Sequence, residues 1–204
     1  TAPAIAKYEN GQIIPNSEKL IEFANAYKVK VLDLLKTYNA PKMKFNAFRK
    51  KQRLQGQNLE LLKELIQNKV SDYFEVIELN QLKSSNTKLK KYSCNSIEDA
   101  ENAANSFSKD HQLSINQPIS DLISVLENIG IIIMEIDNYD DRFKDFDGLS
   151  EIVNNVPIIA ILKYNDGARQ RFTIAHELGH LVLDIKNNKV DEEKMCNRFA
   201  GALL

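Results

Sequence analysis

One short apolar stretch decides how this sequence is interpreted: Thr173-Ile174-Ala175-His176-Glu177-Leu178-Gly179-His180-Leu181-Val182-Leu183. It contains the pattern His-Glu-x-x-His, in a chain that has only 3 histidines. Residues four apart lie on one face of a helix, so His176 and His180 would point the same way and share one metal ion. Two neutral imidazoles suit zinc, and Glu177 between them can reach a water on that ion as general base. The pattern therefore predicts a zinc-hydrolase site, and the scarcity of histidine disfavours a chance pair on a helix surface.

A catalytic zinc site needs a third protein ligand and keeps a fourth position open. A short loop after the first motif, residues 191–204 predict another helix, with Asp191 as its N-cap. Its apolar stripe, which would pack on the core, consists of Met195, Phe199, Ala202 and Leu203. Glu192 and Glu193 are both candidates for the third ligand, and both are also ordinary first-turn charges of a helix. Spacing alone does not choose between them.

Two runs of the sequence carry a resemblance to a known family. They are Arg169-Gln170-Arg171-Phe172-Thr173-Ile174-Ala175-His176-Glu177-Leu178-Gly179-His180 and Glu193-x-x-Cys196-Asn197-Arg198-Phe199-Ala200-Gly201-Ala202-Leu203-Leu204. Together they resemble the ImmA/IrrE family of bacterial metallopeptidases, and Phe146-Asp147-Gly148-Leu149-Ser150 is similar to what precedes the metal helix there. The resemblance implies that Glu193 completes the metal site, with Glu192 as the second choice. It also implies one zinc ion, although two histidines and a glutamate suit manganese or iron as well.

The resemblance further implies a biological role. We expect a zinc-dependent endopeptidase of a bacterial or phage regulatory system that cleaves a repressor or antitoxin-like protein by metal-activated water. The alternative is a DNA-binding transcriptional regulator whose metal site is a sensor or a relic. A purely structural zinc is a third interpretation, which Glu177 disfavours because a closed site has no use for a base. The sequence names no oxyanion-stabilising side chain, and Tyr164 is a guess.

The first 35 residues predict three short helices. The first ends near Gly11, the second follows Pro15 and Ser17, and the third begins near Val31. This order resembles the second half of a phage-repressor-type (XRE-like) helix-turn-helix domain, although a generic helical hairpin looks similar. On the first interpretation, DNA contacts would come from Thr1, Ala2, Pro3 and Lys7. The family pattern would continue past both ends of the sequence, so we expect further chain before residue 1 and after residue 204.

The remaining pattern predicts an α+β fold. We expect a partial helix-turn-helix domain at 1–38, a helical linker at 39–95 and a small zincin-like domain with a short β-sheet and the His-Glu-x-x-His helix at 96–204. The linker contains a long helix from about Leu59, which packs either within the chain or on a second copy in a homodimer, and a connector at 83–95. Helices are predicted from Ser96 and over 119–129, a buried strand over 131–136, and a hairpin from strands at 148–153 and 157–162.

Composition places the chain among soluble globular proteins. Hydrophobic residues make up 43% of the sequence and charged residues 27%. No apolar run reaches the ~20 residues of a membrane span, and only 2 cysteines are present, so we expect a cytoplasmic protein without membrane contact. Cys196 is expected to be a buried thiol rather than a metal neighbour. Basic residues between 41 and 53 are interpreted as a solvated linker rather than a phosphate-binding patch.

Overall fold

The computed structural model describes residues 2–35, 41–45, 56–81, 87–114, 117–137, 141–163, 166–186 and 190–204. The chain forms two compact units, Thr1–Asn39 and Ala40–Leu204. The described part of the first unit, residues 2–35, holds three helices, α1 (Ala2–Glu9), α2 (Ser17–Tyr27) and α3 (Val31–Leu35). Asn16 caps α2, because its side chain accepts a hydrogen bond from the backbone N–H of Lys19. The three predicted helices are confirmed, whereas their likeness to a helix-turn-helix stays a prediction.

The second unit mixes helices with short strands, so the expectation of an α+β fold is confirmed, and the arrangement is consistent with a small zincin-like domain. Its elements are α5 (Gln57–Leu79), β1 (Tyr92–Ser93), α6 (Ile97–Asp110), α7 (Leu122–Ile129), β2 (Ile132–Ile136), the 3₁₀ helix η1 (Asp141–Phe143), β3 (Gly148–Val153), β4 (Val156–Leu162), α8 (Gly167–Val182), β5 (Leu183–Asp184) and α9 (Glu192–Leu203). The predicted boundary between residues 95 and 96 stays a prediction. The range predicted as a linker contains α5, which belongs to the same unit as the sheet.

Three strands form the central sheet in the order β2-β4-β3, with β2 parallel and β3 antiparallel to β4. The predicted hairpin is confirmed: Asn154 and Asn155, at φ 49 and 63, form the two-residue turn between β3 and β4. Asparagine tolerates this left-handed backbone, which the tight turns of hairpins require. Pro157 is the second residue of β4 and lies opposite Ile152. Its missing N–H takes no hydrogen bond from this pairing, because the pair does not exchange backbone hydrogen bonds.

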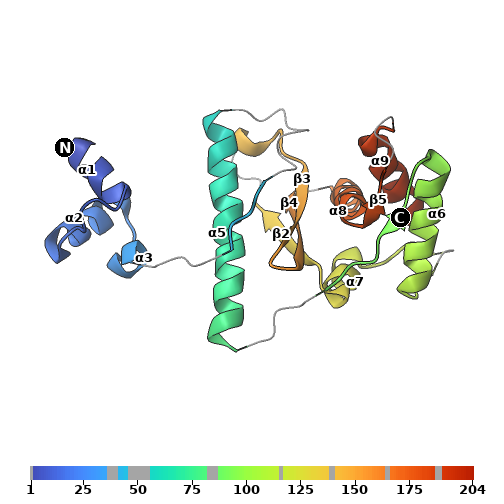
Figure 1. Cartoon of the computed structure of the whole chain (residues 1–204), viewed down its shortest axis with the longest axis horizontal. Helices are drawn as coiled ribbons and strands as arrows, with labels where there is room; N and C mark the ends of the chain where they lie inside the picture. The colour runs from blue at the N-terminus through green and yellow to red at the C-terminus, as the bar shows by residue number, and fades with distance from the viewer. Residues whose placement is uncertain are drawn as a thin grey trace. The chain divides into compact units, whose positions relative to one another are not determined.

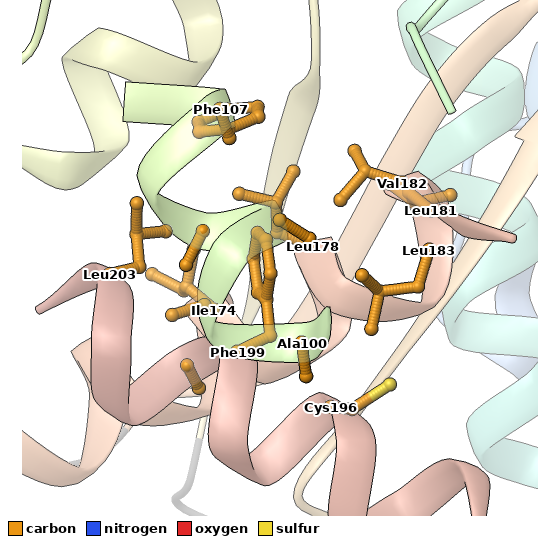
Figure 2. Close-up of a cluster of buried hydrophobic side chains, with 14 of the residues drawn as sticks. Ala100, Phe107, Ile174, Leu178, Leu181, Val182, Leu183, Cys196, Phe199 and Leu203 are labelled. Atoms are coloured by element: carbon orange, nitrogen blue, oxygen red, sulfur yellow. The ribbon is translucent and has the colours of Figure 1, made fainter. Parts of the chain in front are cut away.

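Both faces of this sheet are covered. On one face, every second side chain of β4 and two apolar side chains of β3 join Leu62, Ile66 and Val70 of α5 in one apolar cluster. On the other face, Ile159 and Ile161 of β4 pack with α8, α6 and α9 in a second cluster. Figure 1 shows α5 and α8 on opposite sides of the sheet, and Figure 2 shows the second cluster around Phe107, Leu178 and Phe199. Strand β4 is therefore buried on both faces, which explains its continuous apolar sequence.

The end of α8 is fixed by a segment that the sequence suggested only as a connector. In that segment β1 pairs in parallel with β5, with Tyr92 opposite Leu183. The Nζ atom of Lys91 donates a hydrogen bond of 2.7 Å to the carbonyl oxygen of Leu181, and burial lowers the pKa of this ammonium group. The interpretation of 83–95 as a plain connector is wrong at residues 92–93, because pairing over ninety residues leaves no local pattern in so short a strand.

Candidate metal centre

Helix α8 places the two motif histidines. Asp166 caps this helix, because its Oδ1 atom accepts hydrogen bonds of 2.9 and 3.3 Å from the N–H groups of Ala168 and Arg169. Two turns later the rings of His176 and His180 share one face, and their Nε2 atoms lie 3.2 Å apart. Both side chains are 14% exposed. The helix therefore presents two imidazole nitrogens side by side at a partly sheltered point of the surface.

Helix α9 brings a carboxylate to the same point. Asp191 caps it by accepting hydrogen bonds from the N–H groups of Glu193 and Lys194. In the first turn, Glu193 Oε2 lies 3.4 Å from His176 Nε2, and Glu193 Oε1 lies 3.7 Å from His180 Nε2. Ligand atoms of the three residues all lie within 4.8 Å of one another. The structure thus brings together the three residues that were expected as metal ligands.

Gly179 determines how closely the two helices approach. A Cβ atom built on Gly179 would lie 3.2 Å from both Cα and Sγ of Cys196 on α9. No side chain larger than hydrogen fits there without displacing α9. The thiol of Cys196 is fully buried in this contact, as expected, and its Sγ also lies 3.4 Å from His180 Nδ1. The glycine inside the motif is therefore explained by helix packing rather than by chemistry.

Replacing Gly179 with Ala is expected to lower the free energy of unfolding by about 1–3 kcal/mol, because the added methyl group overpacks the α8–α9 contact. Gly201 on α9 is the matched control, since a Cβ there meets nothing within 4 Å. The control substitution Gly201→Ala should stabilise the chain by about 0.5–1 kcal/mol through the better helix propensity of alanine. Urea unfolding of both variants measures the difference. Equal effects of the two substitutions would contradict the role given to Gly179.

The Nδ1 atoms of both histidines have partners on α9. Asn197 Oδ1 lies 2.9 Å from His176 Nδ1, and Glu192 Oε1 lies 2.9 Å from His180 Nδ1. An acceptor at Nδ1 favours the tautomer that carries its proton there, which directs the Nε2 lone pair of each ring toward Glu193. Glu192 thus contacts a ring on the side away from Glu193. The structure assigns different positions to the two neighbouring glutamates, which the sequence could not.

The donor set fits a zinc ion. Two ligand atoms at about 2.0–2.1 Å from a tetrahedral zinc ion lie roughly 3.3 Å apart. The Nε2–Nε2 distance of 3.2 Å and the His176–Glu193 distance of 3.4 Å match that spacing. Two imidazoles and one carboxylate are also the donors of catalytic rather than structural zinc sites. The three side chains could therefore hold one zinc ion without rearrangement.

Glu177, between the two histidines on α8, contacts strand β3. Its side chain is buried, and its Oε2 atom accepts a hydrogen bond of 2.9 Å from the Ser150 hydroxyl group. Gly148, on the same strand, leaves room for it, because a Cβ there would lie 3.2 Å from Glu177 Cγ. The sheet therefore fixes the orientation of the glutamate that the sequence predicts as general base.

Residues 127–204 match the family model described as the IrrE N-terminal-like domain, Peptidase_M78. This part, less than half of the chain, is similar to the IrrE N-terminal-like family. The match supports a metallopeptidase-type function, and it agrees with the resemblance noted in the sequence. No curated protein and no solved structure matches the chain.

The matched region contains every residue of the candidate metal centre, from Ser150 on β3 to Asn197 on α9. Sequence reasoning gave no role to Ser150 or Asn197. Asn197 had a usable signal, since it lies four residues after Glu193 and thus on the same face of its helix. Ser150 ends the run Phe146–Ser150 of the resemblance, but nothing local pairs it with Glu177, which lies 27 positions away in another element.

Several other residues singled out in the sequence lie away from this centre or outside the described part. Arg169, which opens the first run of the resemblance, forms a salt bridge of 2.8 Å with Asp147. The Nη1 atom of Arg171 donates to the carbonyl oxygen of Ser120 at 3.2 Å. Tyr164 lies outside the described residues.

The predicted DNA contacts belong to the first compact unit. Pro3 and Lys7 are exposed on α1, Ala2 begins this helix, and Thr1 lies outside the described residues. The site they would form stays a prediction. Most of the basic cluster that follows this unit, residues 46–55, also lies outside the described part.

Removing the hydroxyl group of Ser150 tests whether the domain uses it to orient Glu177. Ser150→Ala is expected to lower kcat by about tenfold and the free energy of unfolding by about 1–3 kcal/mol, because a buried carboxylate loses a donor. Metal content should stay unchanged. Ser71→Ala is the control, since Ser71 is also buried but donates to the Gln67 carbonyl oxygen on α5. Peptide-cleavage kinetics measure kcat of the two variants, and urea unfolding measures their stability. An equal loss of kcat in the two variants would contradict the role given to Ser150.

Proposed function

We propose that this chain is a zinc-dependent endopeptidase of a bacterial or phage regulatory system, whose substrate is a repressor or antitoxin-like protein. The convergence of His176, His180 and Glu193 within 4.8 Å of one another is the observation that carries the proposal. The family match at residues 127–204 supports the hydrolase class. Zinc is favoured by the donor set, and manganese or iron would fit the same donors.

In the proposed reaction each residue has one task. His176, His180 and Glu193 would hold the metal ion, while Asn197 and Glu192 keep the two imidazole rings in orientation. When bound, zinc supplies Lewis acidity, which lowers the pKa of water toward ~7 and polarises the scissile carbonyl group. Glu177 takes the proton of the attacking water and passes it to the leaving amine. The Ser150 hydroxyl group donates a hydrogen bond to Glu177 and so holds its carboxylate in orientation for this step.

A peptide-library digestion tests the function without knowledge of the natural substrate. The full chain, loaded with one equivalent of zinc, is incubated with a mixture of peptides from a digested bacterial proteome, and new N-termini are identified by mass spectrometry. We expect cleavage that stops on addition of a chelator and returns with zinc. The same assay on candidate repressors then identifies the regulatory substrate. Chelator-insensitive cleavage, or none, would contradict the proposal.

A DNA-binding transcriptional regulator is the second candidate. It is favoured by the separate helical unit at Thr1–Asn39, whose first helix exposes Lys7. If this function holds, the protein should bind an operator with an affinity that falls steeply as salt rises, because phosphate contacts release counterions. Gel-shift titrations at two salt concentrations measure this. A homodimer would double the number of DNA contacts, and the mass of the protein in solution shows whether one forms.

A further inference from the structure

Large apolar side chains are exposed at few places in the second unit. Of its described residues outside α5, three such side chains are more than a third exposed: Ile97, Ile152 and Phe172. Ile97 stands at the start of α6, whereas Ile152 and Phe172 lie on β3 and α8, the two elements that hold Ser150 and Glu177. Scattered apolar residues on a surface are ordinary, but two beside a candidate catalytic site indicate a function in substrate binding.

Ile152 lies on the face of the sheet that carries the site. Side chains alternate along a strand, so residues 148, 150 and 152 of β3 share one face. Gly148 and Ser150 lie against Glu177 of α8, which identifies this face. Leu149 and Val153 belong to the apolar cluster on the opposite side. Ile152, 49% exposed, therefore stands about 7 Å beyond Ser150 on the same surface.

Phe172 lies at the other end of the site. It precedes His176 by four residues, one helical turn, and shares its face of α8. Strand β3 and helix α8 advance in the same direction, because Gly148 lies against Thr173 and Glu177 while Ser150, further along, lies against Glu177. Ile152 is thus displaced toward the C-terminal half of α8, and Phe172, 39% exposed, toward its N-terminal half.

The edge of β3 offers hydrogen bonds along the same line. β3 is the last strand of the sheet, and no described strand pairs with its outer side. Leu162 donates to the carbonyl oxygen of Asp147, so odd-numbered residues of β3 exchange hydrogen bonds with β4. The backbone groups of residues 148, 150 and 152 consequently face outward. A strand with outward backbone groups and an exposed apolar side chain matches an extended apolar peptide.

We infer that the site selects an extended peptide with a large apolar side chain on each side of the cleaved bond, one contacting Ile152 and the other contacting Phe172. This inference rests on the proposed peptidase function and specifies its substrate class. Burying the exposed parts of Ile152 and Phe172 under apolar groups removes apolar surface from water, whereas a charged or hydroxyl side chain there gains nothing. Ile152 and Phe172 are then specificity-determining residues of the reaction.

Binding and cleavage are measured separately. The best-cleaved peptide from the library is labelled with a fluorophore, and each of its apolar positions beside the cleaved bond is changed to Ser. Binding to the Glu177→Gln protein is read by fluorescence anisotropy, and kcat/KM is measured with the unaltered protein. We expect each Ser-containing peptide to lose about tenfold in both, as is usual for the loss of an apolar contact.

Protein variants assign the two contacts. Ile152→Ser and Phe172→Ser should each remove the preference at one peptide position only, and Ile152→Lys should shift that preference toward Asp and Glu. Ile97→Ser is the matched control, at a side chain that is 54% exposed, and should change nothing. Thermal unfolding checks that the variants fold. If a variant does not fold, the peptide series with the unaltered protein still tests the inference.

The outcomes separate the inference from the proposed function. Cleavage without an apolar preference, or a preference that survives both Ser variants, would overturn the inference and leave the peptidase intact. Apolar-selective binding without any cleavage would support the binding surface and contradict the peptidase. Neither binding nor cleavage of any peptide would overturn both.

Discussion

Replacing Glu177 with Gln is expected to abolish peptide cleavage while the metal ion stays bound. Glutamine has the same shape and can still accept the hydrogen bond from the Ser150 hydroxyl group, so the fold should not change. It cannot take a proton from water, and the loss of a general base lowers kcat by about a hundredfold to ten-thousandfold. Single-turnover cleavage of the best library peptide, with metal content measured on the same sample, gives both quantities.

The matched control for Glu177→Gln is Glu98→Gln, which changes an exposed glutamate at the start of α6. This control should cleave as fast as the parent. If Glu177→Gln retained cleavage with its metal in place, Glu177 would not be the base and another proton acceptor would have to be sought. If the Glu177→Gln variant lost the metal as well, Glu177 would act in metal retention, and the purpose of its hydrogen bond with Ser150 would have to be reinterpreted.

Replacing Glu193 with Gln is expected to remove most of the bound metal. Its two oxygens face the Nε2 atoms of His176 and His180 at 3.4 and 3.7 Å, so the amide would replace the one anionic ligand of the set. A neutral amide is a much weaker zinc ligand than a carboxylate, since it brings no charge. Elemental analysis after dialysis should give about one zinc ion per parent chain and a clear loss in the variant.

The neighbouring residue supplies the sharpest control available in this chain. Glu192→Gln changes the same functional group one position away, at 2.9 Å from His180 Nδ1 rather than beside Nε2. It should weaken the metal affinity by about ten- to a hundredfold, the usual effect of removing a partner behind a ligand, and keep the ion bound in excess zinc. The reverse order of the two variants would identify Glu192 as the ligand and refute the assignment made from the geometry.

The local sequence was sufficient to predict a feature wherever its pattern follows the repeat of a helix or the few residues of a turn. The spacing of His176 and His180 fixes both rings on one helical face, whatever the rest of the fold does. The two asparagines between the predicted strands determined the hairpin, because turn chemistry acts over a few residues. The same holds for the caps: Asp191 and Ser96 were predicted from their types and do accept hydrogen bonds in the first turn of their helices.

Element ends were less well determined. The helix predicted over 119–129 begins at Leu122, because Asp121 accepts a hydrogen bond from the N–H group of Ser124 and so stands as its cap. The long helix predicted from about Leu59 begins two residues earlier, after Gly56 at φ 65. Periodicity describes the middle of a helix, whereas its first residue depends on one side-chain hydrogen bond or one backbone angle.

Only the tertiary structure decided how distant residues meet at the site. Whether Glu192 or Glu193 faces the Nε2 atoms depends on the contact of Gly179 with Cys196, which sets how α9 crosses α8. The hydrogen bond from Ser150 to Glu177 likewise exists because a sheet edge is packed against the helix. By itself the sequence determined the chemistry on α8 and the identity of the elements, because helix and strand geometry is local. The third ligand and the support of the base required packing between elements, which no local period encodes.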